Sequence, residues 1–154
     1  MSEAHCTLGR TYIRLDEFRI ARDHLLAALT FQKTNSDPEL LARIYDQLGT
    51  VSFSEGAFSS ARENYMKALG LAEGSSDKNL LGMILLNLGT TLDEGYLGEH
   101  EQSARYIKRA IEHRKVSHKA RMQPADATPS SSATSMIGYS PAMQRVYKLI
   151  GQVA

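Results

Sequence analysis

The chain has 154 residues, of which 42% are hydrophobic and 23% charged, and its net charge of +1 indicates no strongly acidic or basic partner. The single cysteine excludes an internal disulfide, no apolar run approaches the ~18 residues of a membrane span, and the opening Met1-Ser2-Glu3 lacks the features of a signal peptide. We therefore expect a cytoplasmic protein.

Six helical segments follow one another along the first 118 residues, and nothing in that stretch resembles a strand. Apolar side chains recur there at spacings of three and four, which is typical of amphipathic helices. Asp37 can cap a helix, and Pro38 fits its first position, where no N–H partner is needed. The expected helices span residues 3–15, 18–33, 38 to the Glu55-Gly56 turn, 58–72, 78–94 and 99–118.

A Leu-Gly dyad recurs with a period of 40 residues, at Leu8-Gly9, Leu48-Gly49 and Leu88-Gly89. A glycine inside a helix costs roughly 1 kcal/mol against alanine, so three at a fixed period need a packing reason. Each dyad precedes two small residues seven apart, which share one helix face and enclose a larger apolar residue. These triplets are Ala21/Leu25/Ala28, Ala61/Tyr65/Ala68 and Ser103/Ile107/Ala110. The pattern predicts an all-α fold, an α-solenoid of three stacked helical hairpins, in which each glycine lies against a small-residue face.

The dyad followed by this spacing resembles the tetratricopeptide repeat, whose pattern is L-G-x2-Y and then A-x3-F. Leu8-Gly9-Arg10-Thr11-Tyr12 with Ala21-x3-Leu25 carries the resemblance. The 40-residue period exceeds the usual ~34 and overlaps the range of HEAT and armadillo repeats. We interpret the chain as tetratricopeptide-like, because the extra residues fall between the units. The repeat domain is then 1–118, with units at about 2–34, 38–73 and 78–118.

The third unit departs from the other two in its spacing. The distance from its glycine to its first small residue is 14 residues, against 12 in the other units. Gly98 and its neighbours supply the usual turn. We expect the first helix of this unit to be long, or to carry a bulge before Gly98.

The composition changes after His118. Residues 119–135 are rich in Ser, Thr, Ala and Pro, which predicts a flexible linker. Residues 136–154 begin Met136-Ile137-Gly138-Tyr139-Ser140-Pro141-Ala142-Met143, with a short helix expected from Pro141. They resemble the start of the AAA+ ATPase domain of sigma-54-dependent transcriptional activators. No G-x-x-x-x-G-K-[ST] loop occurs in the chain, so ATP and Mg²⁺ are expected only for a domain further downstream.

The tetratricopeptide resemblance places a binding groove on the first helix of each unit. The mixture of apolar and polar side chains there suits an extended peptide or a helix of a partner. In the chaperone-tail binders of this family, lysines and asparagines hold a terminal carboxylate. Cys6, Arg10, Gln47 and Asn87 stand at those places here, so that clamp is not expected. The candidate groove residues are Arg10, Ile13, Arg43, Asp46, Thr50, Phe53, Met83, Asn87 and Thr90, with Cys6 and Leu86 beside them.

No catalytic or metal-binding set emerges from the sequence. The five histidines form no ligand pattern, and no nucleophile, base and acid can be grouped, so neither an enzyme nor a cofactor site is expected. The positive charges of the stretch from Arg105 to Arg121 complement the dipole at the C-terminus of a helix. RNA binding by this stretch is a distant alternative. We do not expect direct nucleic-acid binding or membrane contact, and self-association is possible.

The functional hypothesis follows from both resemblances together. It is a protein-binding regulatory segment of a sigma-54-type bacterial transcription activator, which senses a partner and controls an ATPase domain. The alternative is a free-standing tetratricopeptide adaptor that binds a peptide or helix of a partner.

Overall fold

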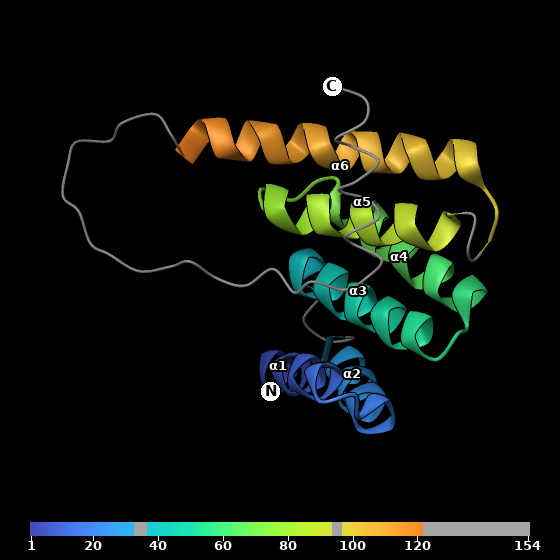
Figure 1. Cartoon of the computed structure of the whole chain (residues 1–154). Coiled ribbons are helices and arrows are strands. Elements are labelled where there is room, and N and C mark those ends of the chain that lie inside the picture. The colour runs from blue at the N-terminus through green and yellow to red at the C-terminus, as the bar shows by residue number, and fades with distance from the viewer. Residues whose placement is uncertain (33–36, 94–96, 122–154) are drawn as a thin grey trace. The chain divides into compact units, whose positions relative to one another are not determined.

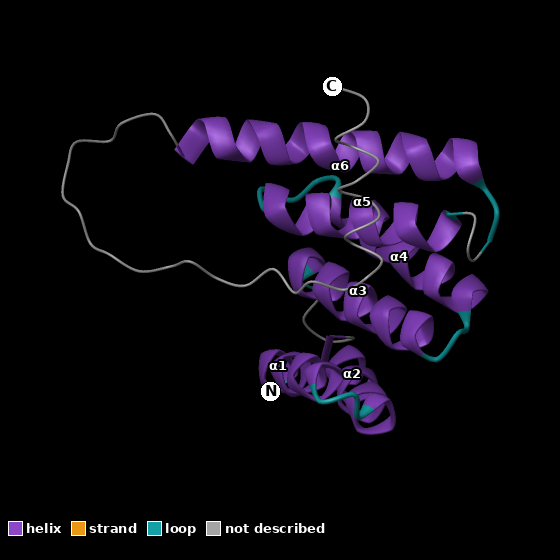
Figure 2. Cartoon of the chain, in the orientation of Figure 1, coloured by secondary structure: helices purple, strands orange, loops and turns teal. Residues whose placement is uncertain are grey.

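The computed structural model describes residues 1–32, 37–93 and 97–121, with side chains up to Lys115. These residues form six helices and no strand (Figures 1 and 2). The helices are α1 (Ser2–Arg14), α2 (Phe18–Gln32), α3 (Pro38–Ser54), α4 (Phe58–Ala72), α5 (Lys78–Leu92) and α6 (His100–Arg121). The all-α fold expected from the sequence is thereby confirmed.

The six helices pack as three hairpins. The most extensive contacts join α1 to α2, α3 to α4 and α5 to α6 (Figure 1). Neighbouring hairpins meet through α2 with α3 and α4 with α5, and the first helices also touch, α1 with α3 and α3 with α5. Each unit therefore contacts the next one along the chain, as expected of an α-solenoid.

The hairpin turns share one backbone device. Asp16, Gly56 and Gly98 have φ values of 59°, 76° and 69°, in the left-handed region where glycine is at no disadvantage. In the first two turns a backbone N–H donates to the carbonyl five residues earlier, Glu17 to Tyr12 at 3.0 Å and Ala57 to Ser52 at 2.9 Å. The chain thus reverses at the same point of the first two units, seven residues after the repeating glycine.

The third turn corrects one expectation. Helix α5 is neither long nor bulged before Gly98: it ends at Leu92, and Asp93 is extended, with a ψ of 166°. The bond that closes this turn, from Glu99 N–H to the Leu92 carbonyl at 2.8 Å, spans seven residues rather than five. Counted from the repeating glycine, α5 ends two residues earlier than α1 and α3 do. The connection between α5 and α6 therefore contains the two extra residues of the third unit and two more that are helical in the other units.

The recurring glycines do mark close helix contacts. A Cβ built on Gly49 would lie 2.5 Å from Cε1 of Tyr65, and one on Gly9 would lie 2.6 Å from Cδ2 of Leu25. Gly89 meets Ile107 in the same way, at 2.7 Å. The nearest neighbour is thus the larger residue in the middle of each triplet, with the small residues beside it. The packing reason is confirmed, and its main partner differs from the one expected.

The core is divided along the array. One cluster of buried side chains, which includes Leu25, Ile44 and Val51, joins the first hairpin to α3. Another, which includes Tyr65 and Leu85, joins the second hairpin to the third. No central core is needed, because each hairpin buries its apolar faces against its neighbours.

The end of α6 changes one predicted boundary, that between the repeat domain and the linker. Helix α6 runs to Arg121, so the first three residues of the predicted linker 119–135 are helical. The remainder of that linker and the segment 136–154 lie outside the described residues. Those boundaries stay predictions.

Candidate partner-binding cleft

The first helices of the three units line one cleft of about 590 Å³. Seven of the nine predicted groove residues contribute to its wall: Arg10, Ile13, Arg43, Asp46, Thr50, Met83 and Asn87. Cys6 lies there as well. Residues that sequence reasoning did not select are Glu3, Thr7, Asp37, Glu39, Leu40, Gln47 and Leu80. The face predicted from the repeat pattern therefore converges on a single hollow, and binding by these residues stays a prediction.

Two of the predicted groove residues lie elsewhere. Phe53 packs edge-on against the ring of Phe58, with 5.4 Å between ring centroids, and borders the core between the second and third hairpins. Thr90 donates its hydroxyl to the Leu86 carbonyl of its own helix at 2.9 Å. Neither residue lines the cleft, although both follow the same helical spacing as those that do.

A polar network around Asp46 ties the wall of the cleft together. The Asp46 side chain, on α3, accepts a hydrogen bond from Nδ2 of Asn87, on α5, at 2.9 Å. Thr50 donates its hydroxyl to the Asp46 carbonyl at 3.1 Å and accepts from the Tyr65 hydroxyl at 3.2 Å. Asp46 is only 4% exposed, and this burial raises the pKa of its carboxyl to about 6, although the bond from Asn87 opposes the rise.

A second polar contact joins α1 to α3. Nε2 of Gln47 donates to Sγ of Cys6 at 3.4 Å. Burial raises the pKa of the Cys6 thiol, which keeps it neutral and a poor nucleophile. The Gln47 Oε1 atom is buried and has no hydrogen-bond partner among the described residues. An acceptor is thus left unsatisfied beside the cleft.

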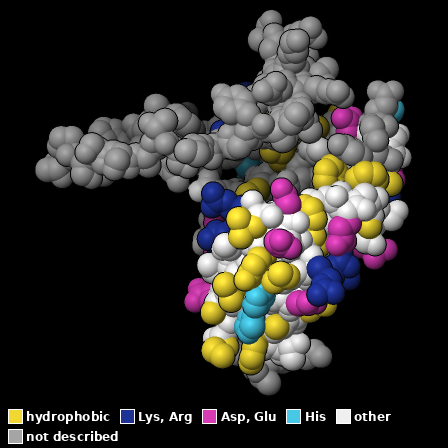
Figure 3. Space-filling view, turned by 60° about the horizontal axis from the view of Figure 1, so that its bottom comes forward, with side chains coloured by type: hydrophobic (Ala, Val, Ile, Leu, Met, Phe, Trp, Pro, Cys, Tyr) yellow, Lys and Arg dark blue, Asp and Glu magenta, His cyan; other side chains and the backbone are white. Residues whose placement is uncertain are grey.

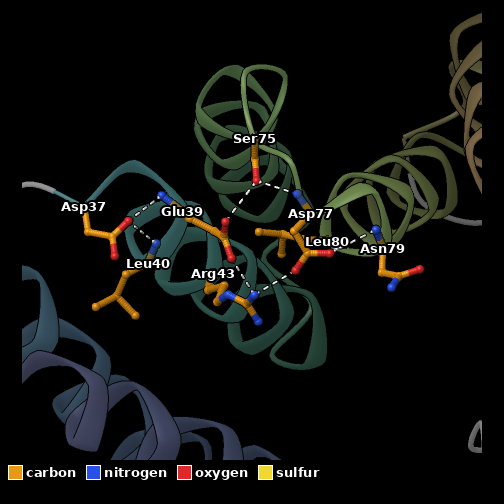
Figure 4. Close-up of polar contacts among 8 residues, drawn as sticks. All are labelled: Asp37, Glu39, Leu40, Arg43, Ser75, Asp77, Asn79 and Leu80. Atoms are coloured by element: carbon orange, nitrogen blue, oxygen red, sulfur yellow. Dashed lines mark hydrogen bonds and ion pairs between the residues drawn. The ribbon is translucent and has the colours of Figure 1, made fainter. Parts of the chain in front are cut away.

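Arg43 forms an ion-pair network at one end of the cleft (Figure 4). Its guanidinium contacts Glu39 at 2.8 Å and Asp77 at 2.7 Å. Ser75 donates its hydroxyl to Glu39 at 3.1 Å and accepts from the Asp77 N–H at 3.0 Å. Asp77 and Asp37 are also the N-caps of α5 and α3, as the sequence predicted for Asp37. Arg43 thus links the second and third hairpins, so its guanidinium already has protein partners.

The apolar part of the cleft centres on α5. Met83 is 51% exposed, unusually open for a large apolar side chain, while Leu80 beside it is buried. Ile13 and Leu40 add partly buried apolar surface from α1 and α3. The cleft therefore offers exposed methionine next to hydrogen-bonding groups, a combination suited to binding a polypeptide segment.

A histidine pair on the first hairpin escaped sequence reasoning. The Nδ1 atoms of His5 and His24 are 3.0 Å apart, and their rings stack on Phe31 and Tyr12 respectively. Figure 3 shows hydrophobic side chains around histidines on the face turned forward there. The two histidines are 19 residues apart on different helices, so no local spacing could reveal the contact. Among the described residues no third histidine, cysteine or carboxylate completes a metal site.

These features define a helical-repeat protein with a cleft lined by its first helices, and comparison with known proteins agrees with the helical-repeat fold. The family model described as tetratricopeptide repeat matches residues 42–74, so the second unit is such a repeat. Tetratricopeptide repeats generally bind partner proteins. No enzyme family is indicated.

A solved structure shares the fold. The crystal structure of BtubC (BKLC) from P. vanneervenii aligns over 90% of this chain, with a TM-score of 0.65 and 21% identity. The alignment covers 54% of that protein, so the chain spans about half its length. At this identity the likeness shows the fold alone. No match was found among curated proteins.

The comparisons give no support for an activator ATPase domain at residues 136–154, so that resemblance stays a prediction. Within the described part of the chain, no helix is long and apolar enough to cross a bilayer.

Proposed function

We propose that the chain is a protein-interaction module that binds a polypeptide segment of a partner in the cleft lined by α1, α3 and α5. The observation that carries the proposal is the convergence of the first helices of all three units on one hollow, with Met83 exposed within it. An extended peptide, or one face of a helix, can pack against that methionine while its polar groups meet the hydrogen-bonding wall.

The proposal can be tested without a known partner. Random twelve-residue peptides displayed on phage are selected on the immobilised full chain, and the recovered peptides are synthesised for affinity measurement. Met83→Ala is expected to weaken their binding about tenfold, because it removes the exposed apolar surface on which the peptide packs. Met66→Ala is the matched control, since Met66 is 45% exposed on α4 and does not line the cleft. Peptides that bind both variants as well as the parent would refute the cleft as the site.

A finer proposal concerns the biological setting. We infer that this module regulates a sigma-54-dependent activator, acts in the cytoplasm and itself holds no cofactor. The supporting observation is the run Ile137-Gly138-Tyr139-Ser140-Pro141-Ala142-Met143. The test is the gene: a G-x-x-x-x-G-K-[ST] motif encoded soon after Ala154 is expected. A stop codon directly after Ala154 would favour the free-standing adaptor.

A further inference from the structure

The wall of the cleft contains a carboxylate that forms no ion pair with any residue that the structure describes. Asp46 lies on α3, is 4% exposed and lines the cleft. Asn87 is the one side chain among the described residues that donates to this carboxylate, through a single amide N–H at 2.9 Å. A buried carboxylate is normally compensated by a positive partner or by several hydrogen bonds. For Asp46 the described residues supply only part of this compensation.

The arginine nearest to Asp46 in the sequence of α3 pairs with other carboxylates. Arg43 precedes Asp46 by three residues on the same helix, but its guanidinium contacts Glu39 and Asp77. Burial therefore dominates the pKa of the Asp46 carboxyl and raises it to about 6.

Other groups in the lining of the cleft are hydrogen-bond acceptors or carry negative charge. The buried Oε1 of Gln47 accepts no hydrogen bond from the described residues. Acidic residues outnumber basic ones in the lining of the cleft, four to two: Glu3, Asp37, Glu39 and Asp46 against Arg10 and Arg43. Charge complementarity thus favours a ligand that brings positive charge and N–H groups.

We propose that the cleft selects partner segments that place a lysine or arginine side chain against Asp46. This proposal rests on the proposed function and adds the chemistry of the ligand. The cationic head forms a charge-assisted hydrogen bond with the carboxylate that Asn87 satisfies only in part. Its aliphatic stem packs along Met83, which supplies exposed apolar surface in the same cleft.

The test uses the phage library of twelve-residue peptides selected on the full chain. The recovered peptides are expected to be enriched in lysine or arginine at one position next to apolar residues. Replacing that basic residue by norleucine, or by alanine where it is arginine, should weaken binding to the parent chain about tenfold to a hundredfold. On Asp46→Asn the same replacement should change affinity less than twofold, because the charge it served is gone. Asp23→Asn, at an exposed position of α2, is the matched control and should keep the full effect.

The outcomes separate the two proposals. Peptides that need Met83 but show no basic preference, or an acidic one, would overturn the inference and leave the proposed function standing. A basic preference of equal size on Asp46→Asn would also overturn it, by assigning the charge recognition to another residue. Recovered peptides that bind regardless of Met83 would refute the proposed function itself, together with this inference.

Discussion

Replacing Asp46 by Asn should stabilise the protein in a pH-dependent way. Burial raises the pKa of Asp46 from its ordinary value of 3.8 to about 6, so the folded state disfavours the charged form. The stability that this group contributes is therefore complete below pH 3.8 and is lost as the pH rises through about 6. Asparagine stays neutral throughout and can still accept the hydrogen bond from Nδ2 of Asn87.

The size of the effect follows from the two pKa values. Their separation corresponds to about 3 kcal/mol of unfolding free energy, which is present below both pKa values and lost once the pH lies above both. Because part of the loss already occurs near pH 4.5, the advantage of Asp46→Asn should grow by about 2 kcal/mol between pH 4.5 and pH 7.5. The change with pH is the informative quantity, since any constant difference between the two side chains cancels.

Urea unfolding of both proteins at the two pH values measures this quantity. Asp23→Asn, at an exposed position of α2, is run in parallel so that the general effect of removing one carboxylate can be subtracted. An advantage that is constant with pH to within about 0.5 kcal/mol, or one that shrinks as the pH rises, would refute the account of Asp46 as a carboxylate lacking a cation.

Three further predictions concern the array. Gly49→Leu should lower the unfolding free energy in urea by about 3 kcal/mol, because even a Cβ added there would lie 2.5 Å from the Tyr65 ring. Arg43→Ala should cost about 1 kcal/mol by the same assay in low salt and less in 1 M NaCl, because its ion pairs with Glu39 and Asp77 are partly exposed. Asp16→Gly should raise the unfolding free energy by about 0.5 kcal/mol and the thermal midpoint slightly. Residue 16 has a φ of 59°, which glycine adopts without the strain of a side chain.

Each of the three has a contradicting result. A Gly49→Leu protein within about 0.5 kcal/mol of the parent would mean that the helices can separate at no cost. Salt-independent destabilisation by Arg43→Ala would point to lost packing of the arginine stem instead of lost ion pairing. A lower midpoint for Asp16→Gly would mean that the aspartate side chain holds its turn.

Local signals explain why the architecture was largely predictable. Apolar spacing marked all six helices, and Asp37 with Pro38 marked the start of α3. The recurrence of glycine every 40 residues predicted the close contacts between the two helices of each hairpin. The end of α5 was missed because the two extra residues of the third unit could enter either the helix or the turn. Only the closure of α5 on α6, through Glu99 and Leu92, decides between them.

The cleft was less predictable, because its side chains depend on partners far along the chain. Helical spacing placed Arg43 and Asp46 on the face that lines the cleft. It could not show that Arg43 is bound by Asp77, 34 residues away, or that Asp46 meets Asn87, 41 residues away. Phe53 shares the spacing of Ile13, yet it packs at the core border beside Phe58. Periodicity identifies a face, while the neighbours of each side chain decide its role.

The most direct test of the proposal that the cleft binds a polypeptide is a methionine-methyl NMR titration of the full chain with a phage-selected peptide. Met83 on α5 and Met66 on α4 are similarly exposed, and Met83 alone of the two lines the cleft. We predict that the Met83 methyl resonance shifts and saturates with the peptide while that of Met66 stays in place. A saturating shift of Met66 with Met83 unmoved would contradict it.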